Sequence, residues 1–389
     1  MLKTNDILED IMHVVIVGGG LVGASAAVAA VRDGHQVTLL ELGQSPDQTP
    51  ASESWDLRIS SVHDNNVDWL ASLGVWHAVN RARFFDYQAL SVTTRDRQTV
   101  EFEASEVGAE RLGVMVENDA LIRACWQVLR TSPQVNLLAQ CQVTSYQLGS
   151  QQLVLSDGQT LAYDLLIGAD GTHSQVAKAA GIGMRGWDYD MRCLLAIADV
   201  EQPLPAKTWE IFRAEGPYAL LPLGKHLACL IDYRAEQTWR GADDSVIADE
   251  LQQTFTPHIG DFRLQKSASF PLRRQRALRY TDGHHVALVG DAAHSIHPLA
   301  GQGVNLGFVD VQCLLTELGQ KPVADALLAY ERQQMKTNQQ MMRMMDAIHV
   351  GFRSRHLFSR LAVAVGLGAV ANVAPLKRQI IQAAMGRTK

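Results

Sequence analysis

The feature that most constrains this chain is a glycine-rich turn that follows its first apolar run. Residues 12–17 are apolar, and Gly18, Gly20 and Gly23 then fit the pattern GxGxxG at the start of a helical stretch over residues 22–32. In this pattern the first glycine permits a tight turn, the second lets the backbone approach a pyrophosphate, and the third permits close packing of the helix. The sequence therefore predicts a Rossmann-like unit that binds a dinucleotide at a helix N-terminus.

An acid at the end of the next strand supports this interpretation. The strand predicted over residues 36–40 ends in Glu41, where a carboxylate can hold the hydroxyl groups of a ribose. A second GxGxxG match at residues 181–186 has the opposite context, because a helical stretch precedes it and a strand-like stretch follows. We interpret this second match as the end of a helix and a loop.

Two later strands also run into an acid beside a glycine. A buried strand over residues 164–168 leads to Asp170 and Gly171, and another over residues 286–290 leads to Asp291. Ligands of open α/β sheets bind beyond the carboxyl ends of the strands. By itself the Asp170 turn is a common strand-to-helix connection, whereas Asp291 is placed to accept hydrogen bonds from a polyol chain.

A glycine-rich stretch after Asp291 completes the third motif. Its glycines let backbone amides approach a planar ligand, and the helix that follows directs its positive end toward that ligand. Reduced flavin carries negative charge on its pyrimidine side, which such a helix would stabilise. His294 and His297 are candidates for relaying a proton, although structural hydrogen bonding is the favoured interpretation of both. The candidate flavin-binding residues of the stretch are Pro298, Gly301, Gln302, Gly303 and Asn305.

The rest of the pattern adds a β-rich middle to the nucleotide-binding part. Strand-like runs fill residues 187–235, and helices are predicted over residues 62–73 and 118–129, with Asn118 as N-cap of the second and Ser174 as a later cap. We expect an α/β fold in which a Rossmann-like domain is interleaved with a β-sheet substrate domain and followed by helices. The expected segments are nucleotide-binding parts at residues 12–75, 111–183 and 276–350, substrate-domain parts at residues 76–110 and 184–275, and a helical tail at residues 351–389.

Composition excludes several classes of protein. Of the 389 residues 47% are hydrophobic and 20% charged, and the net charge of −6 offers no basic face for nucleic acid. The five cysteines show no CxxC spacing, so we expect no metal site. The start of the chain lacks the pattern of a secretory signal, which predicts a cytoplasmic protein. The apolar residues 361–374 would span about 21 Å as a helix, too short for a bilayer core of roughly 30 Å.

Together the motifs resemble those of the single-component FAD-dependent aromatic hydroxylases, the para-hydroxybenzoate hydroxylase type. The resemblance spans about residues 12–349 and rests on GxGxxG, on Ala169-Asp170-Gly171, and on the stretch from Gly290 to Asn305. Further segments resemble the ubiquinone-biosynthesis hydroxylases within this group, above all those that act on a demethoxy-ubiquinol. These segments are residues 56–60, 116–118, 298–307 and 376–379.

The resemblance implies roles at the nucleotide end of the cofactor. Glu41 would bind the adenosine ribose, and Arg58 would approach the FAD pyrophosphate or the flavin edge. Asn118, in the segment of residues 116–118, would also belong to the cofactor site. Asp170 and Gly171 would serve the pyrophosphate region and the encounter with NAD(P)H, which docks without a second nucleotide-binding fold.

The resemblance also implies roles at the flavin end and exposes one departure. Asp291 would bind the ribityl chain, and residues 301–305 would cradle the isoalloxazine. Where the family pattern ends in an arginine, this chain has Ala177 with Lys178 beside it. Either Lys178 substitutes for that arginine or the affinity for nicotinamide nucleotide is altered, because lysine offers a point charge and not a planar fork.

The implied function is that of a flavin-dependent aromatic monooxygenase that uses NAD(P)H and O2 to hydroxylate a polyprenylated quinol. The substrate most expected is the demethoxy-quinol, but His297 is more typical of sister enzymes that act at another ring position. A FAD-dependent dehydrogenase or reductase of the same fold is the enzymatic alternative. A prenyl-binding escort-type protein is an alternative of another class, which an intact flavin motif disfavours.

The tail leaves two interpretations open. The apolar residues 361–374 are followed by Lys377, Arg378, Arg387 and Lys389. This arrangement suits a helix on the anionic surface of the inner membrane, or a docking helix for enzymes that handle the same apolar substrate. Packing of the tail on the protein core is weighed equally.

Overall fold

The predicted Rossmann-like unit forms the centre of a five-stranded sheet. In the computed structural model, which describes residues 11–295, 302–353 and 373–387, the strand order is β18-β12-β1-β2-β8 and every neighbouring pair is parallel. The inner strands are almost wholly buried, as a parallel sheet covered on both faces requires. The strands are β1 (His13–Val17), β2 (Gln36–Leu40), β8 (Val135–Leu138), β12 (Leu165–Gly168) and β18 (Val286–Leu288).

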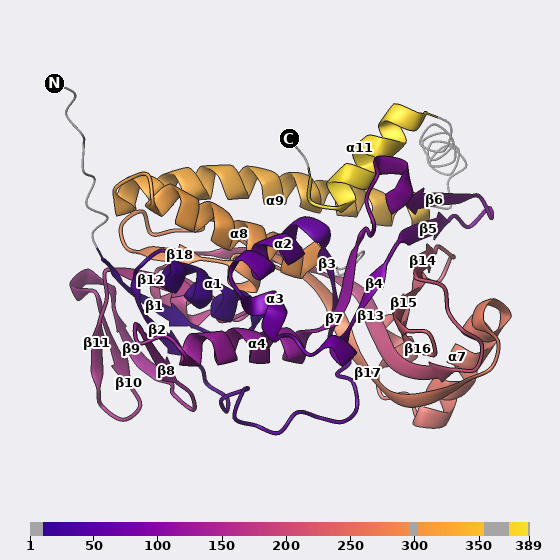
Figure 1. Cartoon of the computed structure of the whole chain (residues 1–389), viewed down its shortest axis with the longest axis horizontal. Coiled ribbons are helices and arrows are strands. Elements are labelled where there is room, and N and C mark those ends of the chain that lie inside the picture. The colour runs from indigo at the N-terminus through magenta and orange to yellow at the C-terminus, as the bar shows by residue number, and fades with distance from the viewer. Residues whose placement is uncertain (1–10, 296–301, 354–372, 388–389) are drawn as a thin grey trace.

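Helices cover this sheet, and the first of them is buried on most of its surface. The alanine-rich α1 packs against both α4 and α8, and the long α9 lies along α8 (Figure 1). Small side chains let α1 approach its neighbours closely. The helices are α1 (Leu21–Arg32), α4 (Asn118–Arg130), α5 (Gln175–Ala179), α8 (Gln302–Leu318) and α9 (Val323–Arg353).

The β-rich middle forms an eight-stranded sheet with the order β19-β17-β13-β16-β15-β14-β5-β6. Strands β5 and β6 come from the segment at residues 76–110, so two separate parts of the chain build this sheet. Its strands are β5 (Ala89–Thr93), β6 (Thr99–Glu103), β13 (Met184–Val200), β14 (Lys207–Ile211), β15 (Tyr218–Gly224), β16 (Leu227–Ala235), β17 (Phe262–Ala277) and β19 (His294–Ser295).

Two smaller sheets and several short helices complete the fold. One sheet, β3-β7-β4, lies between the five-stranded and eight-stranded sheets, and the other is β11-β10-β9 (Figure 1). Their strands are β3 (Ile59–His63), β4 (Phe84–Tyr87), β7 (Gly113–Glu117), β9 (Val143–Gln147), β10 (Gln152–Leu155) and β11 (Thr160–Ala162). The other helices are α2 (Asp64–Ser72), α3 (Val75–Ala78), α6 (Glu236–Trp239), α7 (Asp244–Ile259) and α11 (Ala374–Ala384).

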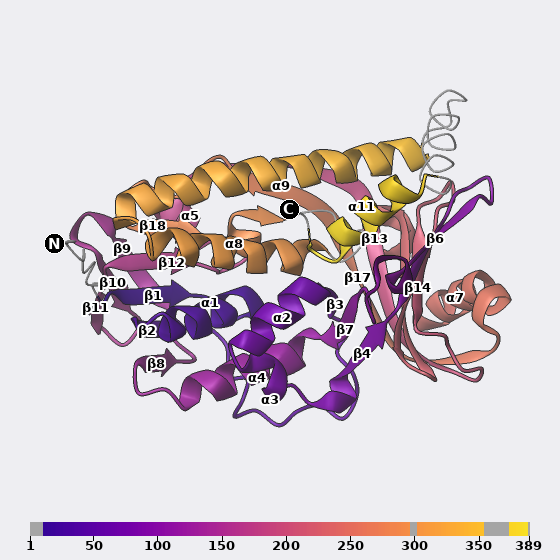
Figure 2. The same ribbon diagram turned by 45° about the horizontal axis from the view of Figure 1, so that its top comes forward.

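The two faces of the eight-stranded sheet have different partners. Helix α7 covers the outer face, where Leu194 and Leu220 share a core cluster with Phe255 (Figure 2). Leu195 and Leu221 point to the inner face, on the side of the nucleotide-binding part. Alternation along a strand thus divides the leucines of the middle sheet between a structural core and an inward-facing wall.

Three local predictions can be compared with the structure. Ser174 caps α5 as predicted, because its hydroxyl accepts a hydrogen bond from the backbone N–H of Ala177 over 2.9 Å. The helix predicted over residues 62–73 begins only at residue 64, since the residues before it pair as strand β3. Asn118 is the first residue of α4 and not its N-cap, which is Glu117.

Core packing is the arrangement that α11 adopts. Ile381 and Met385 are fully buried in a cluster with the inner face of the large sheet. Two of the basic residues that one interpretation of the sequence assigned to a membrane surface form ion pairs within the protein: Lys377 with Glu106 over 2.7 Å, and Arg387 with an acid of α2.

The apolar segment at residues 361–374 lies outside the described residues except for its last two positions. In the part of the chain that the structure describes, every helix is too short or too polar to cross a bilayer.

Candidate functional site

The three sequence motifs and Glu41 meet at one edge of the five-stranded sheet. The register pairs Val17 with Leu40 and Gly168, and Gly168 in turn with Leu288, so the carboxyl ends of four neighbouring strands lie side by side. The residues that follow these strands are therefore neighbours, although more than half of the chain separates them. They are the turn at Gly18–Gly23, Glu41, Asp170 and Asp291.

The glycine-rich turn has the shape of a cradle. Gly18 has a φ of +106°, and a Cβ there would lie 2.4 Å from the carbonyl oxygen of Ala169. A Cβ on Gly23 would lie 1.9 Å from the carbonyl oxygen of Gly18. Gly20 differs, because a Cβ there would meet no described atom within 4 Å. The turn is thus closed against the protein at two glycines and open at the third, where a ligand can approach.

The N-terminus of α1 is left open at the same place. Its N-cap is Gly20, no side chain caps it, and no acid lies in its first turn. The first amides of a helix then have no partner within the helix, and the helix dipole favours an anion there. The geometry therefore fits the phosphates of a dinucleotide.

Glu41 organises this turn from the neighbouring strand. Its two carboxylate oxygens accept hydrogen bonds from the backbone N–H groups of Gly19 over 2.8 Å and Gly43 over 2.7 Å. The indole N–H of Trp126 donates to the carbonyl oxygen of Gly19 over 2.9 Å. The sequence did not single out Trp126, which supports the turn from α4, because a buried aromatic residue in a helix carries no local signal of such a contact.

Asp170 serves as a helix cap. Its carboxylate accepts hydrogen bonds from the hydroxyl of Ser174 over 2.5 Å and from the backbone N–H groups of Gln175 over 2.7 Å and Val176 over 3.2 Å. Both oxygens are thus engaged within the protein. Gly171 follows with a φ of +78° and lets the chain turn into α5.

The departure from the family pattern lies on α5. Ala177 is 1% exposed and packs in the core, whereas the side chain of Lys178 is exposed. Consecutive residues of an α-helix are about 100° apart around its axis. Lys178 therefore points away from the direction of residue 177, which disfavours a simple replacement of the arginine.

Two of the segments that carry the family resemblance hold one another in place. The backbone N–H of Asp56 donates to the buried carboxylate of Glu117, and that of Asn118 donates to the carbonyl oxygen of Arg58 over 3.0 Å. The hydroxyl of Ser60 donates to Asn118 Oδ1 over 2.6 Å. The side chain of Arg58 is 69% exposed and pairs with Asp56 over 3.3 Å. Residues 117–118 thus fix the backbone that presents Arg58.

Asn305 makes its side-chain contacts with the protein. Its Oδ1 accepts hydrogen bonds from the backbone N–H of His63 and from Asn66 Nδ2, both over 2.9 Å, and its Nδ2 donates to the carbonyl oxygen of Ser61 over 2.7 Å. The side chain therefore joins α8 to β3 and α2. A direct contact of this amide with the flavin is not what the geometry favours.

The rest of the third motif divides between described and undescribed residues. Asp291 is exposed at the strand ends, in a single helical turn (η4, Gly290–Ala292). Gln302 and Gly303 form the first turn of α8. His297, Pro298 and Gly301 lie outside the described residues.

His294 belongs to a buried ion pair. Its Nε2 lies 2.5 Å from Asp310 Oδ2, and both side chains are fully buried. Burial lowers the pKa of His294, but the carboxylate of Asp310 outweighs it and the pKa lies above its usual value. Asp310 also accepts hydrogen bonds from the backbone N–H of Gly290 and from Asn338. This network joins η4 to α8 and α9, and supports the structural interpretation of His294 over a proton relay.

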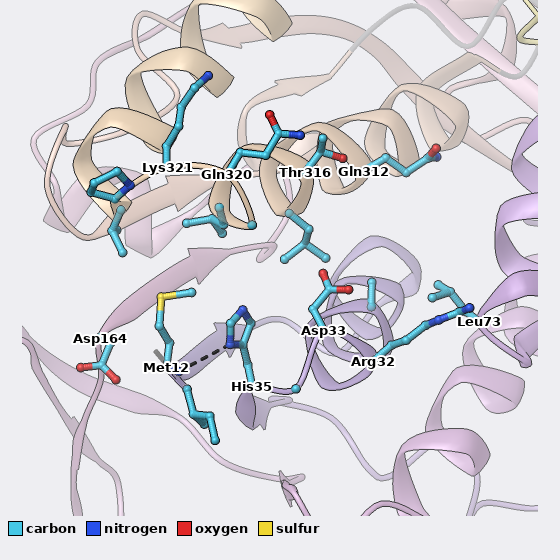
Figure 3. A pocket seen from close by; sticks show the side chains of 18 of the residues that line it. Met12, Arg32, Asp33, His35, Leu73, Asp164, Gln312, Thr316, Gln320 and Lys321 are labelled. Atoms are coloured by element: carbon cyan, nitrogen blue, oxygen red, sulfur yellow. Dashed lines mark hydrogen bonds between the residues drawn. The ribbon is translucent and has the colours of Figure 1, made fainter. Parts of the chain in front are cut away.

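A cavity of about 1390 Å³ lies elsewhere, and it is not this site (Figure 3). Met12 lines it from the amino end of β1, Arg32 and His35 from the end of α1, and Lys321 from the end of α8. These positions are at the opposite edge of the sheet from the glycine-rich turn. The cavity is therefore separate from the edge at which the motifs meet.

The fold and the site define a flavin-binding protein with a Rossmann-like domain and a sheet facing it. The FAD binding domain family matches residues 11–345. The 3-demethoxyubiquinol 3-hydroxylase of Escherichia coli (strain K12) is 36% identical over 386 residues, which cover 96% of this chain and 98% of that protein. The chain therefore belongs to the FAD-dependent hydroxylases of ubiquinone biosynthesis, and it uses FAD with NAD(P)H as reductant.

Other relatives and solved structures agree. The ubiquinone hydroxylase UbiL of Rhodospirillum rubrum is 33% identical, with 98% of this chain and 91% of that protein covered. Human COQ6, a mitochondrial ubiquinone biosynthesis monooxygenase, is 28% identical, with 96% and 92% covered. The crystal structure of p-nitrophenol 4-monooxygenase PnpA from Pseudomonas putida superimposes with a TM-score of 0.80 over 97% of this chain and 99% of that one. At 15% identity the last comparison shows the fold alone.

Proposed function

We propose that this protein hydroxylates the aromatic ring of a polyprenylated quinol, with the demethoxy-quinol of ubiquinone biosynthesis as substrate. The observation that carries the proposal is the meeting of three family motifs and Glu41 at one sheet edge, opposite a second sheet with an apolar inner face. Relatives that match almost the whole chain are named for ubiquinone hydroxylation. FAD supplies the oxygen activation that such a reaction needs once NAD(P)H has reduced it.

Residues of this chain would hold the cofactor at the open positions of the site. The amides at Gly20 and the start of α1 would bind the pyrophosphate, and Glu41 would meet the adenosine ribose beside them. Asp291, exposed at the end of β18, would bind the ribityl chain. Arg58, presented by the segment at residues 56–60, would reach the pyrophosphate or the flavin edge.

Other residues of the motifs would act by positioning. Asp170 would fix the turn into α5, and Asn305 would fix the start of α8 against β3, because the polar atoms of both side chains are engaged within the protein. The N-terminal turn of α8, with Gln302 and Gly303, would direct its amides toward the flavin ring. Residues 298–301 would complete this cradle, as the family resemblance implies.

Two experiments test the proposal. Purified protein supplied with NAD(P)H, labelled O2 and a short-chain demethoxy-quinol should transfer one labelled oxygen atom to the ring, which mass spectrometry detects. A deletion strain should accumulate the demethoxy-quinone. Accumulation of an earlier polyprenylphenol would assign the enzyme to another ring position, as for the sister hydroxylases. Reduction without oxygen incorporation would favour a dehydrogenase, and a colourless protein would favour a prenyl-binding escort.

We also propose that the protein works at the cytoplasmic surface of the inner membrane, where a polyprenylated substrate resides. The support is the apolar character of residues 361–374 and of the substrate. Two of the basic residues that the sequence suggested for such a surface, Lys377 of α11 and Arg387 after it, are paired within the protein and do not contribute to it. Flotation of the full-length protein with anionic liposomes, compared with neutral liposomes, measures this association.

A further inference from the structure

A half-buried acid, with one oxygen fully buried, lies on the inner face of the large sheet. Glu210 is on β14, where its backbone pairs with Ala219 of β15 and with Val92 of β5. Trp209 beside it packs against Phe255 of α7 on the outer face. Because successive side chains of a strand point to opposite faces, Glu210 projects from the inner face. Figure 2 shows that this face looks toward the nucleotide-binding part, on the side away from α7.

The surroundings of Glu210 on this face are apolar and partly open. The same row continues across the sheet, since Ala219 pairs with Ile231 and Ile231 pairs with Leu195. Leu195, Ile231 and Glu210 each keep part of their surface accessible, although the strands that carry them are otherwise largely buried. The row continues beyond Glu210 to Val92 of β5 and Val100 of β6. A carboxyl group therefore interrupts an apolar wall that the rest of the chain does not fully cover.

One oxygen of this acid has no compensating contact among the described residues. Its Oε1 is buried and has no hydrogen-bond partner among the described residues. Burial raises the pKa of Glu210 to about 8. Tyr233, Cys193 and Cys229 lie on the same face, and burial raises the pKa of each, so all three are neutral. The hydroxyl of Tyr233 is already hydrogen-bonded to the thiol of Cys193.

An unpaired buried carboxyl group destabilises a fold, so its presence calls for a functional reason. The flavin chemistry described above does not use Glu210, and neither the sequence motifs nor the family resemblance assigned it a role. Its position is the informative feature. It is a polar group in an apolar wall, on the sheet that faces the edge where the flavin motifs meet.

We propose that the carboxyl group of Glu210 binds a ring hydroxyl of the quinol substrate. This inference rests on the proposed function. Leu195 and Ile231 would pack on the apolar part of the quinol, and a single carboxyl group would determine which way the ring faces the flavin. A protonated carboxyl group both donates and accepts hydrogen bonds, and can therefore hold a hydroxyl group in either direction.

The experiment separates hydrogen bonding from packing by using a matched pair of ligands. Full-length, FAD-loaded wild type, Glu210→Gln and Glu210→Met are titrated without oxygen with a short-chain methoxy-methyl-hydroquinone and with its dimethyl ether, and quenching of protein fluorescence reports binding. We expect Glu210→Met to bind the hydroquinone about tenfold more weakly, as for one lost hydrogen bond, and to bind the ether as wild type does. The affinity of Glu210→Gln for the hydroquinone should lie between those of wild type and Glu210→Met, since an amide retains a donor and an acceptor.

A stability measurement and a control complete the design. Glu210→Met should melt at a higher temperature than wild type, because it replaces an unpaired buried acid with an apolar side chain. Glu215→Gln changes an exposed acid of the same sheet region and should leave both affinities unchanged.

Each other outcome overturns a definite claim. Equal affinity of wild type and Glu210→Met for the hydroquinone would overturn the role of Glu210, even if wild type turns the quinol over. Loss of affinity for both ligands together with a lower melting temperature would show that Glu210 only supports the fold. Wild type that binds neither ligand would overturn the proposed function itself.

Discussion

Substitution of Ile381 by alanine tests whether α11 is part of the core. Ile381 is 0% exposed and packs with residues of the inner sheet face, so its truncation leaves a cavity. Such substitutions destabilise proteins by about 2–5 kcal/mol. Unfolding entropy of about 2.1 cal/mol/K per residue gives roughly 0.8 kcal/mol/K for a chain of 389 residues. The melting temperature of Ile381→Ala should therefore fall by roughly 2–6 °C.

The assay is thermal unfolding followed by the release of flavin fluorescence and, separately, by circular dichroism. Leu376→Ala is the matched control, because Leu376 lies on the same helix, is 37% exposed, and should change the melting temperature by less than about 1 °C. The core interpretation of α11 would be refuted if Ile381→Ala melted like the control and had instead lost its association with liposomes. That result would mean that the apolar face of α11 serves an external surface.

Three further predictions follow from the site. Gly20→Ala should lose bound FAD without a change in the melting temperature of the apoprotein, because its Cβ would meet no described atom. Gly23→Ala should lose both FAD and stability, because its Cβ would collide with the backbone of Gly18. Absorbance measures the bound FAD and calorimetry measures the stability. Asp310→Asn should destabilise the protein by about 3–5 kcal/mol in denaturant titrations, because it removes the charge that compensates His294 in the core and replaces one of two acceptor oxygens with a donor. The unfolding free energy of wild type relative to Glu210→Gln should fall as the pH rises from 4.5 to about 8, since the folded state holds a proton that the unfolded chain has released. The slope is at most about 1.4 kcal/mol per pH unit, and an upward slope would contradict the burial of this acid.

The nucleotide-binding edge could be predicted because its signals are local. Each motif begins directly after a short apolar run, and the carboxyl ends of parallel strands meet by the geometry of the sheet. The positions of Gly18, Glu41 and Asp291 at one edge follow from that rule alone. The rejected match at residues 181–186 obeys the same logic, since Gly181 ends the turn after α5 with a φ of +65° and strand β13 begins at residue 184.

The partners of polar side chains could not be predicted, because they depend on contacts between distant segments. Asn118 has the composition of an N-cap, yet its amide oxygen accepts a hydrogen bond from Ser60, which lies 58 residues earlier. Asn305 likewise binds β3 and α2, about 240 residues away in the chain. The role of Asp310 was missed for the same reason. An acid within an apolar helix gives no sign in the sequence that it pairs with His294 of β19.

Glu210 shows how a site residue can escape a search for motifs. In sequence it is one charged residue in a strand that also carries Trp209 and Ile211, a pattern typical of a solvated sheet face. In the structure α7 covers the face of Trp209 and the other face turns inward, so neither face of this strand is a solvated one. Which side chains of this strand are covered therefore depends on what packs against each face of the sheet, and the sequence of the strand alone does not reveal it.

The polar residues of the site fall into two groups by what they already bind. The polar side-chain atoms of Asp170 and Asn305 are hydrogen-bonded within the protein. Breaking such bonds to bind a ligand would cost about 1–3 kcal/mol for each group left unpaired. Asp291 is exposed, Arg58 has only an exposed ion pair with Asp56, and Glu210 has one buried oxygen without a partner. A ligand gains most from groups that lose few contacts when they bind it. The direct contacts of cofactor and substrate should therefore be sought among the second group, and Asp170 and Asn305 should act by holding the backbone around them. Glu41 stands between the groups, because each of its oxygens accepts one backbone N–H and keeps a lone pair for the ribose.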